Sequence, residues 1–261
     1  MKIACGVEYL GKNYHGWQRQ KHCLGIQERI EKALSFVADQ SIEVVCAGRT
    51  DQGVHATNQI IHFDTDSKRM MTAWLRGGNA YLPKDIKLLW AKEVDETFHA
   101  RFSAKWRTYR YVIYTRVTSS AILDGLVTWV KESLDIEAMR EAMVDLLGER
   151  DFSSFRAAEC QSHSAFRNIM SIELIEKGHF LIFEIKGNAF LHHMVRNIVG
   201  TLLEVGLKRK QISWIKELLL LKDRRCAGKT AASDGLYLVD VGYDEQYCLP
   251  RLALGPDFLH A

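Results

Sequence analysis

The residues best suited to chemistry lie in one glycine-rich stretch, residues 46–56, which reads Cys-Ala-Gly-Arg-Thr-Asp-Gln-Gly-Val-His-Ala. It contains a single carboxylate, Asp51, and a guanidinium two residues earlier, Arg49. Glycines on both sides, Gly48 and Gly53, let backbone and ligand approach closely. A charged, well-positioned carboxylate is what nucleophilic catalysis needs. An exposed ion pair on an ordinary turn is the alternative interpretation.

A second stretch combines basic and aromatic side chains, and no acidic residue occurs between Thr97 and Leu123. The basic residues in it are Arg101, Lys105, Arg107, Arg110 and Arg116, and the aromatic ones are Phe98, Phe102, Trp106, Tyr109, Tyr111 and Tyr114. Basic groups attract phosphates, and aromatic rings stack on exposed bases. The stretch therefore indicates RNA binding. A strand whose outward residues happen to be basic is the alternative, and several of the rings must belong to the core in either case.

The composition is that of a folded protein with one large domain or two of ordinary size. The chain has 261 residues, of which 47% are hydrophobic and 26% are charged, which excludes wholesale disorder. Six cysteines without a CxxC pair fit reduced thiols in a cytoplasmic protein. Cys160 and His163 have a spacing typical of metal ligands, but two residues do not make a zinc site, so we expect no metal.

The ends and apolar runs of the chain give no sign of a membrane segment. The first residues alternate as a strand does, with Ile3, Cys5 and Val7 on one face, and lack the apolar core of a signal peptide. The longest purely apolar run, Leu218 to Leu221, is far too short to cross a membrane. We therefore expect a cytoplasmic protein with no membrane partner.

The pattern of apolar residues before residue 98 predicts the elements that position Asp51. Strands are expected over 3–9, 42–46, 59–64 and 86–90, and helices over 26–38 and 70–80. The strand over 42–46 follows from Ile42, Val44 and Cys46, which alternate as the residues of a half-buried strand do. The resulting order, β-α-β-β-α-β, is that of a ferredoxin-like unit.

The second half of the chain predicts a similar mixture of strands and helices. Strands are expected over 106–115, 126–130, 168–176, 179–187 and 236–242, and helices over 135–147, 190–205 and 212–221. Residues 98–105 are the best candidate for a junction between domains spanning 1–104 and 105–261. The predicted fold class is α+β, with two ferredoxin-like or RRM-like halves whose mixed, mainly antiparallel sheets join around a central active-site cleft.

Six further motifs occur in order along the chain. They are Gly11–Gln20 (Gly-x-x-Tyr-x-Gly-Trp-Gln-Arg-Gln), Asn79–Pro83, Phe98–Ala104 followed by Arg107–Tyr111, Asp151–Phe155, Phe190–Gly200 and Gly235–Leu238. With the stretch around Asp51, they make the sequence resemble the tRNA pseudouridine synthase A family over nearly its whole length. The departures are small: Ser164-Ala165 stands where members often carry Thr-Pro, and Ala232 where some carry Pro. These differences affect loop stiffness and leave the chemistry untouched.

The resemblance implies an isomerase that converts uridine to pseudouridine at position 38, 39 or 40 in the anticodon arm of tRNA. The uracil is detached from its ribose and rejoined through C5, so no cofactor and no metal are implied. The family also implies a homodimer that holds tRNA across both subunits. Which tRNA species and which of the three positions are modified stays open, as does the subunit that supplies each RNA contact.

The family pattern also assigns three catalytic residues. Asp51 is the nucleophile, although the sequence leaves open whether it attacks C1′ of the ribose, attacks C6 of uracil, or first removes a ribose proton. Tyr109 is expected to stack on the flipped uracil and to assist deprotonation of C5; a buried sheet tyrosine is the alternative. Arg196 lies in an apolar helix and therefore needs a carboxylate partner. The family pairs this arginine with the catalytic Asp, and Glu204 is the alternative partner.

The remaining site residues are expected to contact the substrate. Arg49 pairs with a phosphate or helps to extrude the nucleotide, and Leu236 forms an apolar wall opposite Tyr109 unless it is simply a core residue. The other expected RNA contacts are Phe98, Arg101, Arg107 and Arg110, with Lys105 beside them. His192 and His193 are expected to be structural, without a catalytic role.

Two rival functions compete with the isomerase. Ile60–Ser67 is an apolar strand that ends in Asp64-x-Asp66, like the opening of haloacid-dehalogenase-like phosphatases with an Asp nucleophile and Mg²⁺. That function needs a parallel sheet and a further acidic cluster, and the C-terminal half offers no clear one. The second rival is a non-catalytic RNA-binding protein, which has no need for Arg49 and Asp51 between two glycines.

Overall fold

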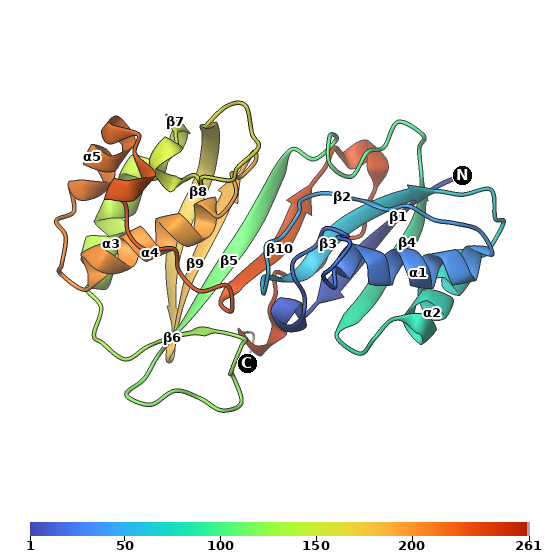
Figure 1. Ribbon diagram of the computed structural model, residues 1–261, viewed down its shortest axis with the longest axis horizontal. Helices are drawn as coiled ribbons and strands as arrows, with labels where there is room; N and C mark the ends of the chain where they lie inside the picture. Colours follow the sequence, from blue (N-terminus) through green and yellow to red (C-terminus); the bar gives the residue numbers. More distant parts are fainter. Residues whose placement is uncertain (260–261) are drawn as a thin grey trace. The chain divides into compact units, whose positions relative to one another are not determined.

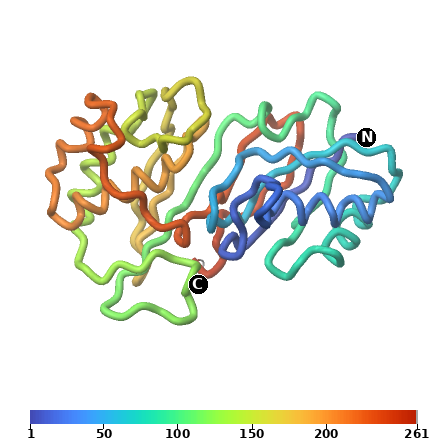
Figure 2. Tube along the Cα trace, in the orientation of Figure 1, coloured from blue at the N-terminus to red at the C-terminus, as the bar shows by residue number. Residues whose placement is uncertain are grey.

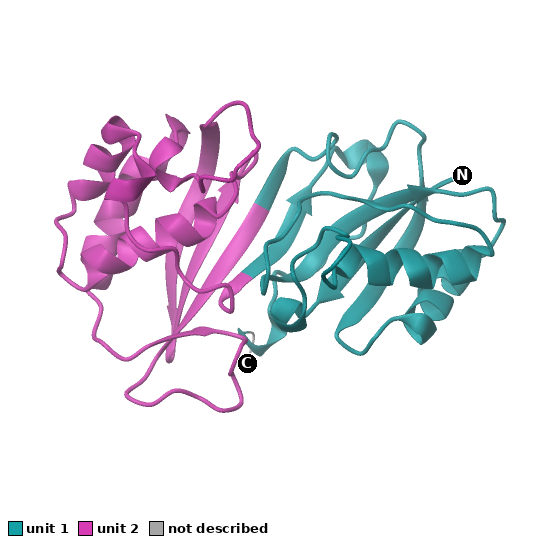
Figure 3. Ribbon diagram, viewed as in Figure 1, with its two compact units in different colours: residues 1–107, 237–261 teal, residues 108–236 magenta. Residues whose placement is uncertain are grey.

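The computed structural model describes residues 1–259 and divides into two compact units (Figure 3). The first unit comprises residues 1–107 together with the described part of 237–261, and the second comprises residues 108–236. The chain passes from the first unit to the second within strand β5 (Trp106–Thr115), and it returns at the start of β10 (Leu236–Gly242). The last part of the trace, beyond residue 236, therefore lies with the N-terminal segments (Figure 2).

The first unit contains the predicted β-α-β-β-α-β series. Its elements are β1 (Lys2–Tyr9), α1 (Ile26–Ala38), β2 (Val45–Cys46), β3 (His55–Asp64), α2 (Met71–Tyr81) and β4 (Ile86–Val94). The antiparallel strands lie in the order β4-β1-β3, and β2 pairs with β3 at Ile61 and His62. This is the strand order of a ferredoxin-like unit. Strand β10 adds a short parallel pairing, in which Tyr237 lies opposite His55.

Both helices of the first unit cover one face of its sheet (Figure 1). Helix α1 buries the residues that recur at helical spacing, among them Ile30 and Leu34. Helix α2 approaches β4 closely, because a Cβ on Gly78 would come within 2.6 Å of the Leu88 side chain. The amide of Asn79 donates to the Leu88 carbonyl and accepts from its N–H, both at 2.8 Å. The Asn79 motif therefore fixes this helix to the edge strand.

The second unit also combines strands with helices on one face (Figure 1). Its elements are β5, β6 (Thr128–Val130), α3 (Ile136–Met143), β7 (Gly148–Asp151), β8 (Phe166–Lys177), β9 (Phe180–Gly187), α4 (Met194–Gly206) and α5 (Trp214–Leu221). The strand order is β5-β9-β8-β7, and β6 pairs in parallel with β5. The predicted α+β class with mainly antiparallel strands is confirmed. Within residues 1–259, none of the helices is both long and apolar enough to cross a membrane.

Several elements differ from the sequence-based prediction. Strand β3 begins at His55 and not at residue 59, and α4 begins at Met194 and not at residue 190. The strand expected over 42–46 is only Val45–Cys46, because the N–H groups of Ile42 and Val44 donate to side chains of α1 and not to another strand. The helix expected over 135–147 ends at Met143 and continues as a 3₁₀ turn over Val144–Leu146. Strand β7 was not expected, since it has no apolar residue apart from a glycine at its start.

Candidate functional site

The predicted site residues are divided between the two units. Asp51, Arg49, Phe98, Arg101 and Arg107 belong to the first unit, whereas Tyr109, Arg110, Arg196 and Leu236 belong to the second. In the first unit, Asp51 lies on the loop that connects β2 to β3, residues 47–54, which we call the acid loop.

Side chains of the sheet fix the beginning of the acid loop. The Gln59 amide on β3 donates to the Gly48 carbonyl at 2.6 Å and accepts from the Gly48 N–H at 3.3 Å. The Ala47 N–H donates to the Ile60 carbonyl at 2.8 Å. Further along the loop, the Thr50 hydroxyl lies 2.8 Å from the Tyr9 hydroxyl of β1. The backbone leading to the acid is therefore attached to β1 and β3 at several points.

The Gly11–Gln20 motif supports the other side of the same loop. The Trp17 N–H donates to the Thr50 carbonyl at 3.0 Å, and the Gly53 N–H donates to the Tyr14 carbonyl at 3.3 Å. Gly16 has a φ of 89°, and a Cβ there would lie 2.8 Å from the Thr50 carbonyl oxygen. This motif therefore positions the acid loop, and its glycine is required both by conformation and by the close approach of two backbones.

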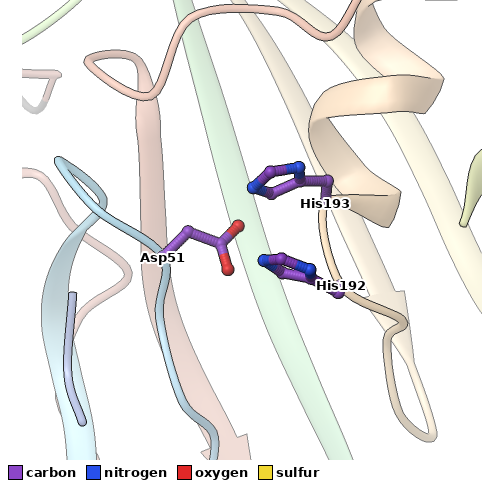
Figure 4. Close-up of side chains that lie close together, drawn as sticks. All are labelled: Asp51, His192 and His193. Carbon is purple, nitrogen blue, oxygen red and sulfur yellow. The ribbon is translucent and has the colours of Figure 1, made fainter. Parts of the chain in front are cut away.

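Asp51 begins a tight turn. The Val54 N–H donates to the Asp51 carbonyl at 3.1 Å, and Gly53 has a φ of 79°. A turn with a glycine of positive φ at its third position is of type II. The Asp51 side chain is half-buried, and Figure 4 shows its carboxylate projecting from the ribbon of the loop. A fixed turn thus carries an acid that remains accessible to solvent.

Arg107 completes the support of the acid loop. Its side chain is 9% exposed, and its guanidinium donates to the carbonyls of Ala47 at 2.9 Å, Arg101 at 2.7 Å and Ala104 at 3.3 Å. It joins the start of the acid loop to the turn that precedes β5. These donors are used within the protein, so the structure gives Arg107 a positioning role.

The thiol within the same motif is not a competing nucleophile. Burial raises the pKa of Cys46 to about 12, although the guanidinium groups of Arg49, Arg101 and Arg107 act in the opposite direction. A protonated, buried thiol is a poor nucleophile at neutral pH. Arg49 and Arg101 are both exposed, and the bridge from the Arg101 carbonyl through the Arg107 guanidinium to the Ala47 carbonyl places Arg101 beside the start of the acid loop.

Phe98 is a core residue of the first unit, with 1% of its surface exposed. Its ring centroid lies 5.1 Å from that of Tyr243, 5.0 Å from that of Tyr247 and 5.9 Å from that of His62. The aromatic residue of this block that reaches the surface is Phe102, which is 76% exposed. The sequence pattern alone does not separate these two residues.

In the second unit, Tyr109 lies on β5 and is 8% exposed. Its ring meets that of Phe190 edge-to-face, with centroids 5.1 Å apart. The neighbouring Arg110 forms an ion pair with Glu184 of β9 at 2.8 Å, and both side chains are largely buried. Leu236, at the start of β10, is 4% exposed.

Arg196 lies in the first turn of α4 and is fixed by a chain segment that crosses the helix. Its Nε donates to the Ala231 carbonyl at 2.8 Å, and the Ala231 N–H donates to the Arg196 carbonyl at 3.1 Å. The crossing is close, because a Cβ on Gly200 would lie 1.8 Å from the Lys229 carbonyl oxygen. Glu204, the alternative partner considered for Arg196, forms an ion pair with Arg209 at 3.3 Å.

The two histidines before α4 form a ring pair. His193 precedes the helix with a φ of 61°, and the His192 and His193 ring centroids are 4.0 Å apart (Figure 4). The His192 backbone accepts from the Ala157 N–H at 3.1 Å, and its N–H donates to the Cys160 sulfur at 3.5 Å. This backbone therefore joins the start of α4 to the turn at 157–160.

Comparison with known proteins identifies the family. A family model described as tRNA pseudouridine synthase matches residues 6–103 and 142–244, a range that includes the acid loop. The chain belongs to the tRNA pseudouridine synthase family. It is 55% identical over 99% of its length to the tRNA pseudouridine synthase A of Pasteurella multocida, of which it covers 98%. It is 56% identical to that of Mannheimia succiniciproducens, with 99% of this chain and 98% of the relative covered.

A chain of a solved structure is also similar, at a much lower level. It comes from the structure titled "Crystal Structure of a Cbf5-Nop10-Gar1 Complex" and matches with a TM-score of 0.38 and 12% sequence identity. The match covers 91% of this chain and 49% of that chain.

Two supporting residues of this tRNA pseudouridine synthase family member were not identified from the sequence. They are Gln59 beside the acid loop and Asn197 beside Arg196. The buried Asn197 amide donates to the Phe155 carbonyl at 2.8 Å and accepts from the Thr230 hydroxyl at 2.7 Å. The available signal was a polar amide in an otherwise apolar strand or helix, since a buried amide needs hydrogen-bond partners.

The structure also removes one rival function. A haloacid-dehalogenase-like phosphatase needs its Asp at the end of a strand in a parallel sheet. In this member of the family, Asp64 ends β3, which is antiparallel to β1, and its carboxylate pairs with Lys2 at 2.9 Å. Asp64 therefore has a structural explanation as the partner of Lys2 at the end of β3.

Proposed function

We propose that this protein is an isomerase that converts uridine to pseudouridine at positions 38, 39 and/or 40 in the anticodon stem-loop of tRNA, the reaction of EC 5.4.99.12. The supporting observation is the family match, which covers the acid loop and extends over both units. Relatives that cover almost the whole chain carry the name tRNA pseudouridine synthase A.

Asp51 is the proposed nucleophile. Its loop is fixed from both sides by Gln59 and by the Gly11–Gln20 motif, which reduces the reorganisation needed before attack. The backbone of Asp51 starts a turn, which holds the residue in place, and its half-buried side chain is still accessible to a substrate. The reaction breaks one glycosidic bond and forms one carbon–carbon bond on the same base, so no external cofactor is required.

Tyr109 and Arg196 are the other proposed catalytic residues. Tyr109 stacks on the extruded uracil, and its hydroxyl assists removal of the C5 proton. Arg196 provides the positive charge that balances the Asp51 carboxylate. Arg49 contacts a phosphate near the target, and Leu236 contributes an apolar contact to the base. In support, the segment at 228–231 fixes Arg196, and the Phe190 ring orients Tyr109.

The substrate partner is the anticodon arm of tRNA, bound by a cytoplasmic homodimer. Arg101 is exposed and is the strongest candidate for a phosphate contact among the basic residues before β5. Arg110 contributes only if it exchanges its ion pair with Glu184 for a phosphate. Phe98 and Arg107 act through the protein, because both are buried and surrounded by protein groups.

The test uses the purified protein and an unmodified tRNA transcript labelled with tritium at C5 of uridine. We expect release of tritium to water, and chemical mapping that places pseudouridine at 38, 39 or 40. Binding of tRNA without tritium release would instead support a non-catalytic RNA-binding protein. Release that maps outside the anticodon stem-loop would contradict the proposed positions while leaving the isomerisation intact.

A further inference from the structure

An exposed aromatic side chain lies on the surface of the first unit, in the turn between β4 and β5. Phe102 is 76% exposed, and its ring stacks on His99 with centroids 4.2 Å apart and an interplanar angle of 28°. Exposure of this extent leaves most of the phenyl ring in contact with water. A phenyl ring with an accessible face can stack on an exposed nucleobase.

The turn that presents Phe102 is fixed in advance by two histidines. The Nδ1 atom of His99 accepts from the N–H groups of Arg101 at 3.2 Å and Phe102 at 3.1 Å. Nδ1 of His62 accepts from the Ala100 N–H at 3.1 Å. The His99 N–H donates to the Ser103 hydroxyl at 3.0 Å, and the Ser103 N–H donates to the His99 carbonyl at 2.9 Å, which closes the turn. A ring held in this way loses little conformational freedom when a ligand stacks on it.

The charge around this ring favours an anion that also carries flat rings. The Arg101 guanidinium lies 5.6 Å from the centre of the Phe102 ring. The Arg107 guanidinium donates to the carbonyls of both Arg101 and Ala47, so this turn lies on the same unit as the acid loop and beside its start. A nucleotide offers both complementary groups, a phosphate for the guanidinium and a base for the ring.

We propose that Phe102 stacks on an unpaired nucleobase of the bound tRNA, with the adjacent phosphate on Arg101. This inference builds on the proposed function and adds a contact that the sequence pattern assigned to Phe98. Phe98 is buried, whereas Phe102 has an accessible face, a fixed backbone and a neighbouring cation. The contact is to the base and is independent of the reaction at Asp51.

The experiment compares Phe102→Leu, Phe102→Ala and Phe102→Trp in the full chain, using the equilibrium affinity for an unmodified anticodon-arm RNA. Leucine keeps an apolar side chain but removes the π-face, so we expect the dissociation constant to rise about tenfold for both the Leu and the Ala variant. Tryptophan keeps the stacking face, so its affinity should stay within about twofold of wild type. The salt dependence should be unchanged in Phe102→Leu, and its slope should fall by about one in Arg101→Ala.

Phe36 supplies the matched control. It is another exposed phenyl ring of the first unit, 62% exposed, and it packs on Tyr81 with centroids 3.7 Å apart. Phe36→Leu should bind RNA like wild type. Wild-type affinity in Phe102→Leu, or an equal loss in Phe36→Leu, would overturn the proposal. Because the readout is RNA affinity and not tritium release, this outcome is distinct from a wild-type protein that binds RNA and releases no tritium, which would defeat the proposed function instead.

Discussion

The side-chain amide of Gln59 is paired with the backbone of Gly48, which lies three residues before Asp51. One hydrogen bond runs from the amide to the Gly48 carbonyl at 2.6 Å, and the other runs from the Gly48 N–H to the amide oxygen at 3.3 Å. Gln59 itself is fully buried on β3. The sheet therefore determines where the acid loop begins, and changes at Gln59 should reach the acid without touching it.

We predict that Gln59→Leu destabilises the fold by about 1–3 kcal/mol, because it leaves the Gly48 carbonyl and N–H without their buried partner. It should also lower the rate of tritium release more than it weakens RNA binding, since the acid loop loses its attachment. Urea unfolding and single-turnover kinetics measure the two effects. Gln59→Glu is the matched variant: it keeps the acceptor for the Gly48 N–H but removes the donor. A Gln59→Leu protein with wild-type stability and wild-type turnover would refute the positioning role.

Gly16 should tolerate no side chain, because its φ is 89° and a Cβ would lie 2.8 Å from the Thr50 carbonyl oxygen. Gly16→Ala therefore combines backbone strain with a displacement of the acid loop, and we expect a loss of about 2 kcal/mol or more in stability together with reduced turnover. Gly178 is the control, since its φ is 57° but a Cβ there would have no neighbouring atom of residues 1–259 within 4 Å. Gly178→Ala should show the strain alone, without an effect on turnover. Equal effects on turnover in both variants would contradict the explanation.

Arg107→Lys should be damaging although the charge is kept. Three backbone carbonyls, those of Ala47, Arg101 and Ala104, receive hydrogen bonds from one planar guanidinium. A lysine ammonium cannot reproduce that fork, so we expect destabilisation of about 2 kcal/mol. Arg110→Lys on the same strand is the comparison, because Nε and Nη2 of Arg110 both lie 2.8 Å from one carboxylate oxygen of Glu184, a charge that an ammonium can also pair with. Thermal unfolding of both variants decides the question, and a larger loss in Arg110→Lys would count against the assignment.

The stability of the first unit should fall as the pH drops from about 6.5 through about 4. Burial lowers the pKa of His62 to about 4, with the charge of Lys2 acting in the same direction. In the unfolded chain this histidine binds its proton near pH 6.5. The unfolded state therefore binds more protons in this interval, so acid favours unfolding, while the full contribution is present above pH 6.5. The loss should be about 3 kcal/mol by pH 4.

The matched variant for this effect is His62→Asn, whose Oδ1 replaces Nδ1 as the acceptor for the Ala100 N–H and does not titrate in this range. Its free energy of unfolding should depend less on pH between 6.5 and 4 than that of wild type. The same pH slope in both proteins would show that other groups cause the acid sensitivity.

Elements with strong apolar periodicity were predicted closely. Helix α1 has the expected bounds because its buried residues recur at helical spacing. Strands β5 and β10 also have the expected bounds, and both are almost continuously buried and rich in β-branched and aromatic residues. Strand β7 carries no such pattern, since it is a short edge strand defined by its pairing with β8. Strand β2 is short because side chains of α1 bind the backbone before it, and no local pattern announces that partner.

The site shows the same division between local and distant information. The motif around Asp51 identified the acid loop and the family, since its residues are contiguous. The support of that loop comes from residues outside the motif, such as Gln59 on β3 and, farther along the chain, Arg107 on β5. Burial separates Phe98 from Phe102 in the same block, and burial depends on Tyr243 and Tyr247 near the end of the chain. Contacts of this range are determined by the fold and leave no spacing signal in the sequence.

The most direct test of the central claim is tritium release from C5-labelled tRNA by purified Asp51→Asn. Asparagine has nearly the same shape but no negative charge, so the turn from Asp51 to Val54 should form as before. We expect the variant to fold, to bind the anticodon-arm RNA like wild type, and to release no tritium even at stoichiometric enzyme over long incubation. Release at a rate near that of wild type would contradict the assignment of Asp51 as the nucleophile.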